Sequence, residues 1–261
     1  MRPARMVLTI TAVALCCTLA YVHFSLAETD RKNAFETWSE KGDCRDEESA
    51  CQDWAAKGEC EKNPKFMLDR CPLACKQCQA PEVDPRDYTG QVLVLNCSLG
   101  QIRILPDFER APLTSSLVLE LAHHPHSCHN CNFYRNEDVP KDGSSGPPYG
   151  LLQGSLAGLL KVPEKEGGDI AMRRGHVAMI PGTREFFINV MDHESWGASM
   201  TVWGSLADTL SMDVVEAMLR LPYKDVKHPT YGTVMRMLTE QVPFVPLAVP
   251  AAVGGSNRRR H

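Results

Sequence analysis

The sequence predicts a mainly β fold, a closed β-barrel with capping helices, together with a small disulfide-rich α-helical module and an N-terminal membrane helix. Three observations predict it. Short apolar runs separated by glycine and proline recur along residues 88–240 and indicate many short strands. Six of the eleven cysteines lie between Cys44 and Cys78, in a segment with few aliphatic residues. A long uncharged stretch follows two arginines at the N-terminus.

Composition excludes some classes of partner. The formal net charge of −4 and the pI near 6.1 argue against nucleic-acid binding. The strongly basic run at residues 258–260 ends the chain and is typical of a solvated tail. We therefore expect no nucleic-acid partner, and no pattern in the sequence predicts a cofactor.

Residues 1–27 predict a signal-anchor or a signal peptide. Arg2 and Arg5 precede an apolar run over residues 6–22, which with its flanks approaches the roughly 20 residues of a membrane span. Residues 25–27, Ser-Leu-Ala, are small enough for a signal-peptidase site. We favour the uncleaved anchor, which gives a single-pass membrane protein of the secretory pathway with everything after the span on the luminal side. A secreted protein is the alternative.

Residues 44–78 predict a disulfide-stapled domain, after a linker over residues 28–43. A segment this short cannot bury enough apolar surface to stay folded without cross-links. Its six thiols, an even number, indicate disulfides, and such bonds persist only outside the reducing cytosol. Spacing alone leaves the pairing of the six open.

This cysteine-rich segment resembles the ShKT domain, a sea-anemone-toxin-like family with six cysteines. The resemblance implies the pairs Cys44–Cys78, Cys51–Cys71 and Cys60–Cys75. It leaves open whether the module binds a partner or spaces the next domain from the membrane. The positions that carry the resemblance are Cys51, Trp54, Ala55, Gly58, Glu59, Cys60, Asn63, Pro64, Phe66, Met67, Cys71, Cys75 and Cys78.

A larger domain is expected over residues 88–240, after a linker over residues 79–87. It opens with alternating apolar residues around a turn at Gly100, which predict an antiparallel hairpin. Pro112 and the helical spacing of the leucines that follow predict a helix. The expected elements are strands over 91–97, 101–105, 176–180, 186–191 and 201–206, helices over 111–122 and 212–220, and a flexible tail over 241–261.

This larger domain resembles a cyclophilin of a divergent group found in plants and algae. The resemblance spans Tyr88 to Leu238, and it is strong at both ends and weak between Ala122 and Gly175. It implies a closed β-barrel with peptidyl-prolyl cis-trans isomerase activity on proline-containing polypeptide segments. The segments that carry it are residues 100–114, 128–135, 146–154, 175–179, 184–189, 202–204 and 212–218.

Isomerisation of an Xaa-Pro bond needs neither a nucleophile nor a metal. Amide resonance sets a barrier of about 18–20 kcal/mol, and a hydrogen-bond donor near the prolyl amide favours the twisted state. Arginine suits this role because it is always charged and its fork is rigid. The resemblance implies Arg135 as the donor, Gln153 as a grip on the substrate backbone and Phe187 as the floor of the proline pocket. We expect one of Phe186 and Phe187 to face inward and the other to face the pocket.

The resemblance also implies a wider substrate-binding set, and several of its positions depart from the family pattern. Gly150 replaces a pocket aromatic, and the loop before it is lengthened. The tryptophan position falls on Ser195 or on Trp196 beside it, and a methionine stands where a pocket histidine is usual. Glu185 replaces a glutamine. A non-catalytic peptide-binding domain is therefore the alternative function. The expected substrate-binding residues are Leu151, Met179, Glu185, Trp196 and Met200.

Cys128 and Cys131 form a second cysteine pattern, among four histidines at residues 123–129. Two cysteines and two histidines are a ligand set that zinc accepts, and C-x-x-C also occurs in redox proteins. We favour a disulfide between them, because exposed luminal thiols oxidise by default. No metal site is predicted.

Overall fold

The computed structural model describes residues 44–48, 50–168, 170–228 and 232–251. The chain divides into two compact units, one up to Pro81 and one from Glu82 onward, and each is described by itself. The expected membrane helix (1–27) and first linker (28–43) lie outside the described residues. Within the described part of the chain, every helix is too short or too polar to cross a membrane.

The first unit is a cystine-stapled module of three short helices, α2 (Cys51–Ala56), α3 (Glu59–Lys62) and α4 (Pro64–Arg70). Among its described residues, the buried members of the apolar core are Cys51, Met67 and Cys71, so sulfur takes the place of aliphatic side chains. The disulfides are Cys44–Cys78, Cys51–Cys71 and Cys60–Cys75, the pairs that the resemblance implies.

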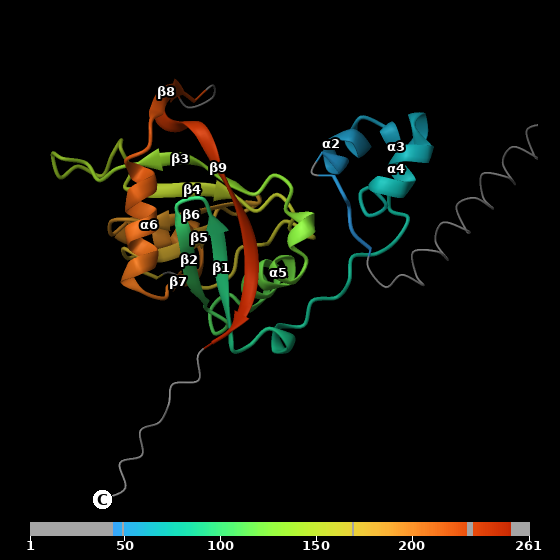
Figure 1. Cartoon of the computed structure of the whole chain (residues 1–261), viewed down its shortest axis with the longest axis horizontal. Helices are drawn as coiled ribbons and strands as arrows, with labels where there is room; N and C mark the ends of the chain where they lie inside the picture. Colours follow the sequence, from blue (N-terminus) through green and yellow to red (C-terminus); the bar gives the residue numbers. More distant parts are fainter. Residues whose placement is uncertain (1–43, 49, 169, 229–231, 252–261) are drawn as a thin grey trace, which may run out of the picture. The chain divides into compact units, whose positions relative to one another are not determined.

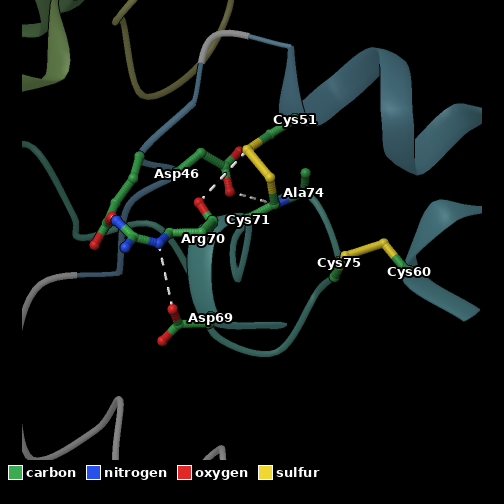
Figure 2. Close-up of a disulfide and its surroundings, with 9 residues drawn as sticks. Asp46, Cys51, Cys60, Asp69, Arg70, Cys71, Ala74 and Cys75 are labelled. Atoms are coloured by element: carbon green, nitrogen blue, oxygen red, sulfur yellow. Dashed lines mark hydrogen bonds and ion pairs between the residues drawn. A yellow bond between two sulfur atoms is a disulfide. The ribbon is translucent and has the colours of Figure 1, made fainter. Parts of the chain in front are cut away.

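Polar contacts complete this module around the Cys51–Cys71 bond (Figure 2). The Asp46 carboxylate accepts a hydrogen bond from the Ala74 backbone at 3.0 Å, which joins the start of the module to its last turn. Arg70 forms ion pairs with Glu47 and Asp69. The ends of the segment are therefore held by side-chain contacts as well as by disulfides.

The second unit is a closed β-barrel (Figure 1). Eight strands pair antiparallel in the order β1-β2-β7-β5-β6-β4-β3-β9, and a pairing between β1 and β9 closes the ring, while β8 adds to β9 alone. The predicted mainly β, closed-barrel class is confirmed. The strands are β1 (Gln91–Cys97), β2 (Gly100–Pro106), β3 (Asn132–Glu137), β4 (Leu151–Ser155), β5 (His176–Met179), β6 (Glu185–Asn189), β7 (Thr201–Leu206), β8 (Tyr223–Lys227) and β9 (Val234–Pro250).

Two helices cap the barrel, α5 (Pro112–His123) and α6 (Thr209–Leu219) (Figure 1). The α5 N-terminus is capped from a distance: the Glu166 carboxylate accepts from the Leu113 backbone at 2.8 Å and from Thr114. This satisfies amide groups that have no partner within the helix. Asp208 caps α6 by accepting from Ser211, so α6 begins three residues before the predicted start at Met212. The largest fully buried side chains of the described barrel are Trp203, Phe133, Phe186 and Phe187.

The prediction of a flexible tail over residues 241–261 is wrong for residues 241–250. These residues are the second half of β9, which runs along β1 in Figure 1 and pairs with it from Phe244 to Pro250. Val242 and Phe244 are buried in the barrel core. Without this half of β9 the barrel would be an open sheet.

The prolines in the second half of β9 lie where a strand tolerates them. Proline lacks the N–H that a ladder needs, so it fits a strand only where that N–H would have no partner. The Phe244 N–H donates to Cys131 on the β3 side, and the Ala251 N–H donates to Gly90 on the β1 side. Even-numbered residues therefore direct their nitrogens away from β1. The nitrogens of Pro246 and Pro250 point to the β3 side, but the pairing of β9 with β3 stops at Pro243. No ladder hydrogen bond is therefore lost at these two prolines.

Candidate functional site

One row of side chains crosses five strands of the barrel. In the observed register Arg135 lies opposite Gln153, Gln153 opposite Phe187, Phe187 opposite Ala178, and Ala178 opposite Val202. Directly opposed residues of paired strands project to the same face of a sheet. The row is polar at the Arg135 end and apolar at the Val202 end, and we call it the outer row.

Arg135 is held at the polar end by a buried carboxylate. Its Nε and Nη2 lie 2.7 and 2.6 Å from Glu137 Oε1, and its Nη1 donates to Gln153 Oε1 at 3.0 Å. The side chain of Glu137 is 0% exposed and that of Arg135 is 15% exposed. These contacts use three of the N–H groups of the guanidinium, and the remaining donors of its fork stay available to a ligand.

Gln153 passes the polar contacts on to Tyr134 and Glu185. Its Nε2 donates to the Tyr134 hydroxyl while its Oε1 accepts from Arg135, so both ends of the amide are oriented. Burial raises the pKa of Tyr134 above its ordinary value, and hydrogen bonding and charge interaction with the Glu185 carboxylate raise it further. Tyr134 therefore stays protonated and is a donor. The chain of contacts begins at Glu137 and ends at Glu185.

Glu137 also fixes the backbone around the site. Its Oε2 accepts from the Tyr149 N–H at 2.9 Å, and its Oε1 accepts from the Arg236 N–H at 3.4 Å. The carboxylate thus connects β3, the end of the long loop before β4, and β9. Sequence reasoning did not identify Glu137, although its spacing of two from Arg135 on a strand predicts that the two share a face.

The apolar end of the outer row is a cluster separate from the barrel core. Phe187 belongs to this cluster, whereas Phe186 lies in the core, which is the division that the sequence predicts for the pair. Leu151, Trp196 and Met200, all expected substrate-binding residues, lie in the same cluster. Its buried members are Leu151, Met172, Ala178, Phe187 and Val202, and its partly buried members are Tyr149, Ile170, Ile180, Trp196 and Met200.

Met179 does not lie in this cluster, and the prediction that it lines the pocket is corrected. Its side chain is in the barrel core, while its neighbour Ala178 is in the outer row. Side chains alternate between the two faces of a strand, so a shift of one residue exchanges core and surface. The small Ala178 leaves more room over Phe187 than a methionine would.

Tyr149 joins the two ends of the site, and sequence reasoning missed it. Its ring centroid lies 5.8 Å from that of Trp196, and the Arg135 guanidinium carbon lies 5.7 Å from its centre. Trp196 in turn lies 6.2 Å from Phe187 in an edge-to-face arrangement. This chain has Gly150 where the resemblance implies a pocket aromatic, and the residue before it, Tyr149, supplies the aromatic ring. The tyrosine of the Gly-Pro-Pro-Tyr sequence was the available signal.

A histidine holds these aromatics together. The ring of His193 stacks on Trp196 with centroids 4.0 Å apart and planes 10° apart. Burial lowers the pKa of His193, an effect opposed by hydrogen bonds with the backbone of Tyr149 and Gly150. The imidazole is therefore neutral at neutral pH, and it connects the end of the long loop to Trp196.

Cys128 and Cys131 form a disulfide in the structure, and both are buried in the barrel core. The described residues contain no group of three or more His, Cys, Asp or Glu side chains arranged to hold a metal ion. Cys97 is the free cysteine of the described part.

Comparison with known proteins gives a family match for the module, no match among curated proteins, and similar solved structures. Residues 43–78 match the ShK domain-like family, which confirms the resemblance predicted for the module. No curated protein matches the chain.

The solved structures similar to this chain include two of a cyclophilin type peptidyl-prolyl cis-trans isomerase from Cryptosporidium parvum. One, determined in the presence of the dipeptide Ala-Pro, is 13% identical, with a TM-score of 0.41, and the similarity covers 61% of this chain and 98% of that one. The other is 14% identical, with a TM-score of 0.42 and coverages of 61% and 97%.

Proposed function

We propose that the barrel is a cyclophilin-type peptidyl-prolyl cis-trans isomerase that acts on proline-containing polypeptide segments. The outer row carries this proposal. It brings an oriented arginine and glutamine to one end of a surface whose other end is apolar and aromatic, and these two chemistries are what a prolyl bond requires.

In the proposed mechanism the proline ring packs on Phe187 and Trp196, and its amide lies toward Arg135. As the bond twists, resonance is lost and the prolyl nitrogen becomes a hydrogen-bond acceptor, which a free guanidinium N–H satisfies. Gln153 and Glu137 hold the guanidinium in place beforehand, so little reorganisation is needed during rotation. No covalent bond forms or breaks.

A second candidate function is peptide binding without catalysis. It is favoured by the ion pair of Arg135 with Glu137, because the carboxylate compensates the positive charge that would stabilise the twisted amide. In this case the same surface grips the proline but does not accelerate rotation.

Isomerisation of a short Xaa-Pro peptide, followed by NMR exchange, separates the two functions. Wild type is expected to exchange the cis and trans signals faster than the uncatalysed time of tens to hundreds of seconds. Arg135→Lys keeps the charge but loses the planar fork, and it should lower kcat/KM about 100-fold. The control is Arg220→Lys at the exposed end of α6.

The outcomes are distinct. Faster exchange that Arg135→Lys removes and Arg220→Lys keeps supports the isomerase. Peptide binding without faster exchange supports the non-catalytic domain. Absence of binding by any proline peptide would exclude both.

We also propose that the protein works in the secretory pathway, on the luminal side and held by its N-terminal segment. The cystine core of the module supports this location, since such a core needs an oxidising compartment. In cells, the expected result is that tagged protein stays in the membrane pellet after alkaline carbonate extraction, with the barrel protected from added protease until detergent is present. Release into the carbonate supernatant would favour the secreted alternative.

A further inference from the structure

The charged side chains around the outer row are not all paired. Arg135 is compensated by Glu137, which is buried against it. Near Trp196, the acidic side chains of Asp192 and Glu194 both pair with Arg173. Within the described part of the chain Glu185 has no such cation, and it interacts with the neutral Tyr134. Of these four carboxylates, Glu185 is the one that forms no ion pair within the described part of the chain.

Two arginines of the barrel have contacts away from Glu185. Arg184 adjoins Glu185 in sequence, but its Nε donates to the Leu159 carbonyl at 3.1 Å. The guanidinium of Arg236 lies over the ring of Tyr223, 4.8 Å from its centre. The Glu185 carboxylate also accepts no hydrogen bond from its own backbone. The Glu185 N–H donates to the Thr183 hydroxyl, and the Glu185 carbonyl accepts from the Ile180 N–H.

Glu185 stands at a defined distance from the floor of the proposed proline pocket. It pairs with Ser155 in the register in which Gln153 pairs with Phe187, so it lies two residues from Phe187 on the same face of β6. Its Oε2 is enclosed and has no hydrogen-bond partner in the described part of the chain. Such a carboxylate is stabilised by any cation that a ligand brings near it.

We propose that Glu185 is a specificity-determining residue that makes the site select proline segments with a basic side chain two residues from the proline. Two strand residues span about 7 Å, and an extended peptide has the same rise per residue. A lysine or arginine at that spacing reaches Glu185 when the proline lies on Phe187. This inference rests on the proposed proline-peptide site, but not on its being catalytic.

The test measures binding of labelled extended peptides to the protein by fluorescence anisotropy at low ionic strength. Each peptide holds one proline and, two residues before or two residues after it, lysine, alanine or glutamate. We expect lysine to bind about 10-fold more tightly than glutamate at one of the two positions, the one set by the direction in which the peptide runs. The preference should shrink at about 0.5 M salt, where such interactions are screened.

Two variants assign the preference. Glu185→Gln keeps the shape and removes the charge, and it should bring the lysine and glutamate affinities to within about 2-fold of each other. The control is Glu164→Gln. Glu164 is exposed and lies two residues before Glu166, the residue that caps α5, and this variant should keep the 10-fold preference.

The failures of the two proposals differ. Equal affinity for the lysine, alanine and glutamate peptides, or a lysine preference that Glu185→Gln retains, would overturn the role of Glu185 and leave the proline site standing. Binding of none of the peptides would overturn the proline site itself, and the selectivity with it.

Discussion

Arg135 and Glu137 form a buried ion pair whose two members have different consequences when removed. Arg135→Leu leaves a fully buried carboxylate without its cation, and we expect it to lower the free energy of unfolding by about 3 kcal/mol. Adding Glu137→Gln removes the charge but keeps an acceptor for the Tyr149 N–H, and should recover about 1–2 kcal/mol. Urea unfolding of the two single variants and the double variant measures this coupling. If the losses of stability in the two single variants add up to the loss in the double variant, Arg135 and Glu137 do not stabilise each other as a buried ion pair. Because Arg135→Leu is expected to destabilise the fold, Arg135→Lys, which keeps the positive charge beside Glu137, is the suitable variant for measuring activity.

Gly150 is required both by its backbone and by its surroundings. It has φ +59°, and a Cβ there would lie 2.4 Å from Met191 Cγ. Gly143 in the same loop has φ +73° but no atom within 4 Å of its Cβ position. Gly143→Ala should therefore cost only about 1 kcal/mol for the backbone, and Gly150→Ala about 2–4 kcal/mol because Met191 must also move. Thermal unfolding compares the two. Equal costs would show that Met191 gives way freely.

His193 makes stability depend on pH. Burial lowers its pKa from an ordinary 6.5, so the unfolded chain binds a proton more readily than the folded one. The contribution of neutral His193 to the free energy of unfolding is therefore complete above about pH 6.5, and it is lost as the pH falls below that value. His193→Phe keeps a flat ring on Trp196 but does not titrate. The difference in Tm between wild type and this variant should narrow between pH 7.5 and pH 5. A constant difference would mean that His193 does not titrate in this range.

At the scale of elements, the long strand β9 decides whether the barrel closes. A chain that ends at Glu240 lacks the buried Val242 and Phe244 and leaves β1 without one of its two partners. We expect this chain to lose cooperative unfolding, whereas a chain that ends at Ala251 should unfold like the full-length protein. Circular dichroism during thermal unfolding measures both. A cooperative transition in the shorter chain would show that the barrel does not need this half of β9.

The sequence predicts elements well where periodicity and turn chemistry agree. The first hairpin and both helices follow from local patterns. Alternation places Phe186 and Phe187 on opposite faces, and the resemblance implies that Phe187 is the outward one. β9 does not follow from local patterns, because its prolines are acceptable only once the positions of β1 and β3 are known. Met179 was misplaced by one residue for a similar reason, since alternation gives the faces of a strand but the register decides which face is the core.

The site was predictable only in part, for a physical reason. Arg135, Gln153 and Phe187 come from three strands, and the family resemblance places them together. Tyr149 and His193 come from loops, where no periodicity marks the direction of a side chain. Their contacts with Trp196 depend on the three-dimensional path of those loops.

At the scale of the whole molecule, the two units keep their folds by different means. The barrel has an extensive apolar core, whereas the module depends on disulfides that close loops of 34, 20 and 15 residues. Each such bond contributes about 3–4 kcal/mol in the chain-entropy account. The barrel disulfide, Cys128–Cys131, closes a separation of only three residues and constrains its unfolded chain much less.

Reduction should therefore unfold the module and spare the barrel. In the full chain treated with a dithiol at neutral pH, limited proteolysis followed by mass spectrometry is expected to give cuts within residues 44–78 and an intact fragment that begins near Glu82. The double variant Cys128→Ser, Cys131→Ser is the control, and under oxidising conditions it should resist cleavage in both units. Cleavage within the barrel at the dithiol concentration that opens the module would contradict independent cores. A protein built in this way keeps the fold of its barrel even where its module has lost its own, so the contributions of the two units to any binding that the protein shows are separable by redox conditions alone.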